Sequence, residues 1–246
     1  MRRMTTTMPS ALSRALELVA EPPTPPDVSK GYLDLLGGRS TDVPKNTGPI
    51  QKVYASSLGS LFFDYAQVLM RKLLSATQHP TEWLNIPHGG VALDVGCGPG
   101  NVTASLADAA GSYGLALGLD IAEPMLARAV RAYSRPNVGF LRADAQRLPL
   151  RDDTVDAVLS IAVLQLVPDP ASAVAEFGRV LRPGGRLALL VPISDHASRY
   201  SWLFPSVGAR FFGDDELGDL LEDDGFLGVH TKTVGHLQWV HGKHAS

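Results

Sequence analysis

A glycine-rich loop is the first feature of the sequence that could do chemistry. Gly96, Gly98 and Gly100 follow the apolar run 91–95 and precede a segment with helical spacing. Glycine allows a tight turn and lets a ligand approach the main chain, while a helix start offers free amides and partial positive charge. The spacing G-x-G-x-G differs from the dinucleotide fingerprint because Asn101 stands where the third glycine belongs, and no Gly-Lys-Ser/Thr follows as in a P-loop.

Two carboxylates follow the next two predicted strands. Asp120 ends the run 115–120, and Asp144 comes just after the run 138–143. A carboxylate at the first of these positions can accept both hydroxyls of a ribose, which alone does not distinguish NAD from other nucleosides. The addition of Asp144 suits a longer nucleoside ligand, with an amino-acid part at the glycines, its ribose on Asp120 and the adenine amine on Asp144.

An alternating series of strands and helices must position these groups. Strands are predicted at 91–95, 115–120, 138–143, 156–161 and 185–192, and a closing strand pair is joined at Gly235; helices are predicted at 100–110, 123–133 and 170–181. Such alternation indicates βαβ units and a parallel sheet covered on both faces. Because ligands bind at the carboxyl ends of the strands of open α/β sheets, we expect the glycines and both carboxylates at one edge.

Composition excludes several classes of protein. The 246 residues are 45% hydrophobic and 19% charged, as in a globular domain, and the net charge of -3 offers no basic excess for a nucleic acid. Cys97 is the single cysteine, so an intramolecular disulfide and a cysteine metal cluster are excluded, and we expect it to be a small buried residue. Without a signal-like segment or a long apolar run, we expect a cytoplasmic protein that does not insert stably into membranes.

Four motifs in order resemble the class I S-adenosylmethionine-dependent methyltransferases, of the UbiE-like small-molecule type. They are VALDVGCGPGNVT, GLDIAEPMLARA, RADAQRLPLRDDTVDAVLS and EFGRVLRPGGRLALLVP, and they cover about residues 88–193. The resemblance implies an α/β fold with a Rossmann-like, seven-stranded, mostly parallel sheet whose last strand is antiparallel. It implies a methyltransferase domain at 81–246, a lid insert at about 194–213 and an N-terminal helical or loop cap at 1–80.

The resemblance also implies the roles of individual residues in binding S-adenosylmethionine, which leaves as S-adenosylhomocysteine. Asp94 would support the ammonium group, and Asp120 would take the ribose hydroxyls. The remaining expected cofactor residues are Gly96, Cys97, Gly98 and Gly100 at the methionine part, Ile121, Met125, Asp144 and Ala145 around adenine, and Ser160, Ile161 and Gln165 at the sulfonium end. For Ile121 and Met125, plain core packing is an equal alternative.

The methyl acceptor is predicted to be small, apolar and aromatic or lipid-like, and to be methylated at oxygen or carbon. Aromatic residues gather in two segments outside the cofactor motifs, where they would form either the acceptor site or a satellite core; the candidates are Tyr54, Phe62, Phe63, Tyr65, Tyr200 and Trp202. His196 is the best candidate for a general base. Residues 160–165 hold no carboxylate pair, so we expect no metal, and Asp169 is expected to cap a helix.

Two alternatives stay open on the sequence alone. One is an NAD-dependent oxidoreductase on a related fold, which the displaced third glycine disfavours. The other is a catalytically silent cofactor-binding module, which the undamaged cofactor motifs disfavour. The sequence leaves the oligomeric state unknown.

Overall fold

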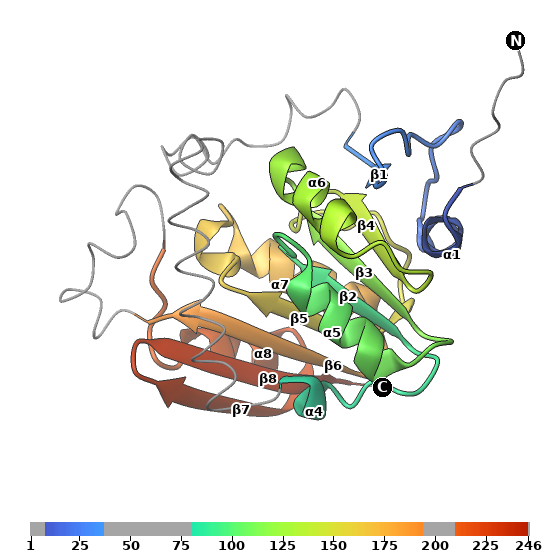
Figure 1. The fold of residues 1–246 in the computed structure, drawn as a ribbon. Coiled ribbons are helices and arrows are strands. Elements are labelled where there is room, and N and C mark those ends of the chain that lie inside the picture. The colour runs from blue at the N-terminus through green and yellow to red at the C-terminus, as the bar shows by residue number, and fades with distance from the viewer. Residues whose placement is uncertain (1–7, 37–79, 194–209, 246) are drawn as a thin grey trace, which may run out of the picture.

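The computed structural model describes residues 8–36, 80–193 and 210–245. One mixed sheet of eight strands, in the order β1-β4-β3-β2-β5-β6-β8-β7, forms the centre of this part of the chain (Figure 1). The strands are β1 Leu33–Asp34, β2 Val91–Val95, β3 Leu115–Asp120, β4 Val138–Arg142, β5 Val155–Ile161, β6 Leu181–Pro192, β7 Phe226–Val234 and β8 Leu237–His244. β8 runs antiparallel to both of its neighbours, β6 and β7, and the other neighbouring strands of this sheet pair in parallel. The predicted Rossmann-like sheet with an antiparallel last strand is confirmed, and β1 adds an eighth strand at the edge.

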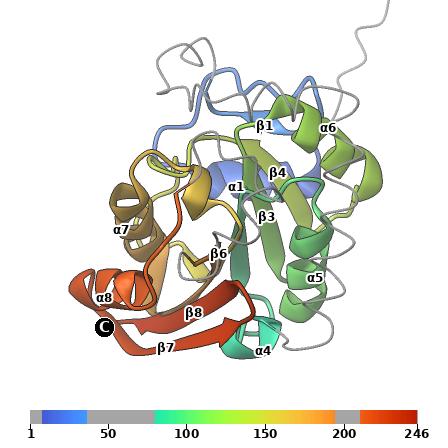
Figure 2. The same cartoon turned by 90° about the vertical axis from the view of Figure 1, so that its left-hand side faces the viewer.

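Helices cover both faces of the sheet (Figure 2). They are α1 Ser10–Leu18, α4 Pro80–Leu84, α5 Asn101–Ala110, α6 Glu123–Ala132, α7 Pro170–Val180 and α8 Glu216–Asp223, with a 3-10 turn, η2, at Leu164–Leu166. Side chains of α1, α7 and α8 pack in one buried cluster on one face, and side chains of α4, α5 and α6 pack in a second cluster on the other. The result is a three-layer α/β/α arrangement.

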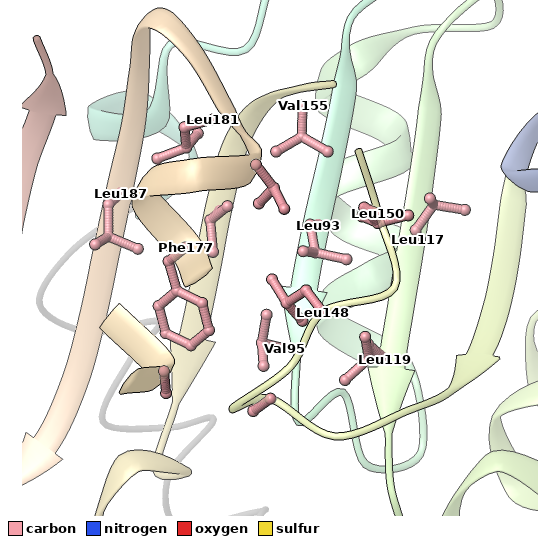
Figure 3. Close-up of a cluster of buried hydrophobic side chains, with 14 of the residues drawn as sticks. Leu93, Val95, Leu117, Leu119, Leu148, Leu150, Val155, Phe177, Leu181 and Leu187 are labelled. Atoms are coloured by element: carbon pink, nitrogen blue, oxygen red, sulfur yellow. The ribbon is translucent and has the colours of Figure 1, made fainter. Parts of the chain in front are cut away.

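The core between the sheet and α7 explains why the strands read as continuous apolar runs. Phe177 of α7 lies among leucines and valines that β2, β3 and β6 direct to this face, as Figure 3 shows. Every residue of β2 is buried. A central parallel strand must be apolar on both sides because helices cover both faces.

The ends of the helices follow their local sequence. Asp169 begins α7: its Oδ1 accepts a hydrogen bond from the amide of Ser172 at 3.2 Å, and Pro170 fits the first turn, where no amide donor is needed. This confirms Asp169 as a helix cap. At the C-terminal end of a different helix, α5, Gly111 takes the left-handed φ of +79° that favours glycine after a helix.

The described part of the predicted N-terminal cap packs on the sheet. Ala11, Leu12 and Ala15 of α1 are buried in the same cluster as β2, β3 and β4. The chain then runs along the outer edge of β4, where Leu33 and Asp34 pair in parallel with Leu141 and Arg142. Residues 8–36 therefore complete the layer of helices on one face and extend the sheet by one strand.

Candidate functional site

The glycine loop lies at the carboxyl end of β2, where the order of the strands changes direction. β2 stands between β3, which follows it in the chain, and β5, and this is the switch point at which open α/β sheets bind ligands. The amides of Gly96 and Cys97 both donate to the carbonyl of Leu119, at 2.7 and 3.0 Å. The loop is thereby tied to the end of β3, next to Asp120.

Glycine is required at Gly96 for two reasons. Its φ is +73°, in the left-handed region, and a Cβ atom built there would lie 2.1 Å from Cγ2 of Val163. Gly98 and Gly100 also have positive φ, of 52° and 85°. Gly100 precedes the first turn of α5, where no side chain caps the helix, so the amides at this end are not taken by a capping side chain.

Asp120 joins the loop to the following turn. Its Oδ2 accepts a hydrogen bond from the amide of Gly98 at 2.9 Å, and its Oδ1 accepts one from the amide of Ala122 at 2.8 Å. Burial raises the pKa of this carboxyl above its usual value, while the amides of Ala122 and Gly98 oppose the rise. The two donors fix the carboxylate plane beside the glycines.

Asp94 lies one layer deeper, inside β2. Its side chain is only 2% exposed, and Oδ2 accepts a hydrogen bond from the Thr103 hydroxyl of α5 at 2.6 Å. Burial raises the pKa of Asp94 to about 7, and the nearby charge of Asp120 adds to the rise, although the Thr103 hydrogen bond opposes it. Asp94 therefore titrates close to neutral pH, where its charge responds to a cationic group bound nearby.

Cys97 is confirmed as a small buried residue. Burial raises the pKa of its thiol well above the ordinary value, and the carboxylates of Asp120 and Asp94 raise it further. A thiol held in its neutral form is a poor nucleophile. Its sulfur packs closely on β3, since a Cβ atom on Gly118 would lie 2.9 Å from Sγ and 2.8 Å from Oγ1 of Thr103.

Thr103 and Gly118 belong to the site, although the sequence interpretation did not include them. Gly118 breaks the apolar run LALGLD, and a glycine inside a strand marks a close approach of other groups. That signal was available in the sequence. The sequence carries no such signal for Thr103, because its hydrogen bond to Asp94 depends on the packing of α5 against β2.

The residues predicted to surround adenine come from the segment after β3 and from the segment after β4. Ile121 is exposed, whereas Met125 is buried at 5% exposure, so packing accounts for Met125 and leaves Ile121 as the accessible side chain. Asp144 follows β4; its Oδ1 accepts hydrogen bonds from the Gln146 amide at 3.0 Å and from Gln146 Nε2 at 3.3 Å. Ala145 is buried beside it.

The end of β5 and the η2 turn that follows it contain buried polar side chains. The side chains of Ser160 and Gln165 are buried, and Ser160 Oγ and Gln165 Oε1 have no hydrogen-bond partner within the described ranges. Between them, Ala162 takes a φ of +56°, which is unusual for a residue with a Cβ atom. Buried polar atoms are rarely left unpaired, so together with the glycine cradle and the two carboxylates they fit a nucleoside with a polar amino-acid tail.

The predicted acceptor side lies outside the described residues. His196 and most of the lid insert predicted at 194–213 are outside those residues. So are the six aromatic candidates for the acceptor site, Tyr54, Phe62, Phe63, Tyr65, Tyr200 and Trp202. Within 8–36, 80–193 and 210–245, no three His, Cys, Asp or Glu side chains gather as metal ligands would. None of the helices in these ranges is long and apolar enough to cross a membrane.

Comparison with known proteins gives a consistent result. Residues 93–189 match a protein family described as a methyltransferase domain. The demethylmenaquinone methyltransferase of Bacillus licheniformis is 32% identical over 210 residues, which are 69% of this chain and 90% of that protein. The 2-phytyl-1,4-naphtoquinone methyltransferase of Thermosynechococcus vestitus is 33% identical over 187 residues, covering 65% of this chain and 83% of that protein.

Solved structures agree at the level of the fold. The crystal structure of an S-adenosylmethionine-dependent methyltransferase from Mesorhizobium loti superposes with a TM-score of 0.55 at 22% identity, over 64% of this chain and 93% of that one. The matched region in sequence spans β2 to β6, which carry the glycine loop, Asp120 and Asp144.

Proposed function

The chain belongs to the class I S-adenosylmethionine-dependent methyltransferases of the UbiE-like type, and on this basis we propose that it methylates a small, apolar, quinone-like ring. The two relatives are named for methyl transfer to demethylmenaquinone and to 2-phytyl-1,4-naphtoquinone, which are both quinones. An acceptor of this kind agrees with the small apolar acceptor that the sequence predicts.

The chemistry of the cofactor makes few demands on the protein. S-adenosylmethionine supplies a methyl group already activated by its sulfonium charge. In the reduced, quinol form of such a ring, an unsubstituted carbon would accept this methyl group, so that a carbon–carbon bond replaces the sulfur–carbon bond and the ring carbon loses its proton. The products are the methylated quinol, S-adenosylhomocysteine and one proton. Catalysis then consists mainly of proximity, alignment and exclusion of water.

The residues of this chain would divide the binding of the cofactor among the ends of four strands, β2, β3, β4 and β5. The glycine loop and Asp94 would hold the methionine part, with the Asp94 carboxylate facing the ammonium group. Asp120 would accept the ribose hydroxyls, and Ile121 and Asp144 would contact adenine. Ser160 and Gln165, whose buried oxygen atoms lack partners among the described residues, would face the sulfonium end. The single observation that carries this proposal is the Asp120 carboxylate clamped beside the glycine loop by the amides of Gly98 and Ala122.

We propose a cytoplasmic location for the protein and no nucleic-acid partner, in keeping with the net charge of -3. His196 remains the proposed general base, to be used if the acceptor is a hydroxyl.

The test is methyl transfer from cofactor labelled in its methyl group to a panel of acceptors, analysed by mass spectrometry. A short-chain naphthoquinol under reducing, oxygen-free conditions is the expected substrate, and a catechol and a primary amine serve as matched competitors. Labelled ring product from the naphthoquinol alone is expected. Label on the amine or the catechol, and none on the quinol, would contradict the proposed acceptor while leaving the methyltransferase activity itself intact.

A further inference from the structure

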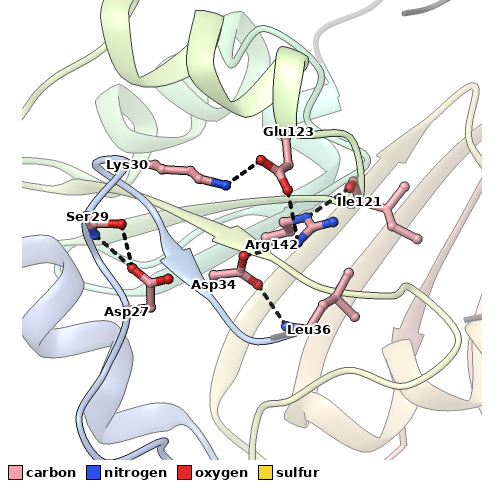
Figure 4. Close-up of polar contacts among 8 residues, drawn as sticks. All are labelled: Asp27, Ser29, Lys30, Asp34, Leu36, Ile121, Glu123 and Arg142. Atoms are coloured by element: carbon pink, nitrogen blue, oxygen red, sulfur yellow. Dashed lines mark hydrogen bonds and ion pairs between the residues drawn. The ribbon is translucent and has the colours of Figure 1, made fainter. Parts of the chain in front are cut away.

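A cluster of four charged side chains links the N-terminal segment to the turn after Asp120 (Figure 4). Arg142, the last residue of β4, places Nη1 3.0 Å from Oδ2 of Asp34 and 3.2 Å from Oε1 of Glu123. Glu123, the first residue of α6, also pairs with Nζ of Lys30 at 2.5 Å. We call residues 27–36, which contribute Lys30 and Asp34, the N-terminal strap.

The pair at the centre of the cluster differs from an ordinary surface ion pair. The side chains of Arg142 and Asp34 are only 13% and 11% exposed, whereas those of Lys30 and Glu123 are 53% and 40% exposed. Exposed pairs contribute little because water screens them, but removing one partner of a mostly buried pair leaves an uncompensated charge. The strap also fixes Arg142 through the backbone, since the amide of Leu35 donates to the Arg142 carbonyl at 3.0 Å.

Arg142 reaches the cofactor turn by a separate hydrogen bond. Its Nε donates to the carbonyl of Ile121 at 3.4 Å, and the next amide along the chain, that of Ala122, donates to Asp120. The backbones are in register as well: Asp120 pairs with Arg142, and the Ala143 amide donates to the Asp120 carbonyl at 3.3 Å. The guanidinium therefore holds the peptide that separates Asp120 from α6.

We propose that Arg142 is a positioning residue for the nucleoside half of the cofactor and that the N-terminal strap, through Asp34, keeps it in place. This rests on the proposed role of Asp120 in binding ribose. The fork of donors on arginine lets one side chain satisfy the strap, Glu123 and the Ile121 carbonyl together, which the point charge of a lysine does not reproduce. Holding this turn in its binding shape before the cofactor arrives lowers the cost of ordering it on binding.

The experiment measures dissociation constants of S-adenosylhomocysteine and of adenosine by calorimetry, for the full chain and four variants. Arg142→Met removes the contacts, Arg142→Lys keeps the charge, and Asp34→Asn removes the charge of the strap in a side chain of the same shape. Arg135→Met is the matched control, because Arg135 pairs with Asp108 at 2.8 Å in an exposed ion pair away from the loop. Circular dichroism verifies that each variant is folded.

Arg142→Met is expected to weaken both ligands by the same factor, about ten-fold, which corresponds to about 1.4 kcal/mol. Equal losses of affinity for the two ligands locate the effect in the nucleoside half, which both ligands share. A general loosening of the site would also disturb the glycine loop and would therefore weaken S-adenosylhomocysteine more than adenosine. Arg142→Lys is expected to weaken both ligands as well, and it replaces the methionine variant if that variant does not fold. Asp34→Asn is expected to act in the same direction, and Arg135→Met to leave both affinities unchanged.

Wild-type affinities in folded Arg142→Met and Arg142→Lys would overturn the inference. A full affinity in Asp34→Asn would overturn the part that concerns the strap, and an equal loss in Arg135→Met would assign the effect to general destabilisation. Failure of the proposed cofactor binding is distinguishable from all of these, because the unmodified chain would then bind neither ligand, and a wrong acceptor would leave all of these affinities unchanged.

Discussion

The Asp120 carboxylate accepts a hydrogen bond from the amide of Gly98 at 2.9 Å, so the predicted ribose-binding residue also fixes the glycine loop. The two residues are separated by 22 positions and belong to the ends of neighbouring parallel strands. Each supports the other: the loop orients the carboxylate, and the carboxylate holds the loop amide. If the loop holds the methionine part and Asp120 the ribose, as proposed, this hydrogen bond couples the two halves of the cofactor site.

Replacement of Asp120 by alanine is expected to weaken the binding of S-adenosylhomocysteine strongly. Each charge-assisted hydrogen bond to the ribose contributes roughly 1.5–3 kcal/mol. Calorimetry gives the affinity, and hydrogen exchange is expected to show faster exchange at the Gly98 amide, which loses its acceptor.

Asp108→Ala is the control for the Asp120 variant, because Asp108 is an exposed carboxylate of α5 whose partner is Arg135. It is expected to leave the affinity unchanged. An Asp120→Ala protein that binds the ligand as tightly as the wild type would show that the ribose lies elsewhere.

Gly96→Ala is expected to abolish cofactor binding, and Gly89→Ala is its matched control. Both glycines have positive φ, of +73° and +83°, so both variants carry the backbone strain of an L residue in this region, about 1–2 kcal/mol. Only at Gly96 would the new methyl group lie 2.1 Å from Val163, whereas at Gly89 nothing lies within 4 Å. Thermal unfolding and calorimetry separate the strain from the steric conflict.

The double variant Gly96→Ala with Val163→Ala tests the cause directly. Removing the Val163 methyl groups relieves the conflict but not the strain, so part of the cofactor affinity is expected to return. Equal behaviour of Gly96→Ala and Gly89→Ala would mean that the strained φ alone explains the requirement for glycine.

The central strands could be predicted from the sequence because their signal is local. Short apolar runs between glycines and polar turns gave the bounds of β2 and β3 as observed, and the displaced third glycine pointed away from a dinucleotide, in agreement with the methyltransferase relatives. The start of β6 was predicted at 185 but lies at Leu181, because Leu181 pairs with Val155 before the turn at Gly184.

The strap and its contacts could not be predicted because they depend on distant pairing. β1 has only two residues, which carry no periodicity, and it exists because Leu33 and Asp34 meet the end of β4. Arg142 reads in sequence as a charged residue at a strand end. Its partner Asp34 stands 108 positions away, and only the folded edge of the sheet brings them together.

Methyl transfer is expected to need no divalent metal. The segment SIAVLQ at 160–165, which includes the end of β5, holds no carboxylate, whereas a metal-dependent transfer to vicinal hydroxyls would need hard oxygen ligands at this point. Activity measured in excess EDTA should equal the untreated activity. Loss of activity with EDTA and recovery with Mg²⁺ would contradict this and would shift the acceptor towards a catechol.

Asp94 is expected to make the stability of the ligand-free protein fall as the pH rises from about 4 to about 7. Burial raises its pKa in the folded protein to about 7 from the ordinary value of 3.8, so over this interval the folded state keeps a proton that the unfolded state has lost. The free energy of unfolding then decreases with pH, by at most about 1.4 kcal/mol per pH unit for one group, and levels off above the folded pKa.

Asp94→Asn isolates this contribution, because its side chain has the shape of the protonated acid and does not titrate. Urea unfolding at a series of pH values gives the free energy of unfolding of both proteins. The value for the variant is expected to rise relative to that of the wild type between about pH 4 and 7, and the difference is expected to stay constant above that. Asp120, whose pKa burial also raises, contributes a trend of the same sign to both proteins, and because its charge interacts with that of Asp94, only part of this trend cancels in the comparison. Bound S-adenosylhomocysteine should reduce the wild-type slope, since its ammonium group would favour the ionised carboxylate, and should leave the variant unaffected. A wild type and a variant whose stabilities run parallel from pH 4 to 8 would show that Asp94 is ionised throughout.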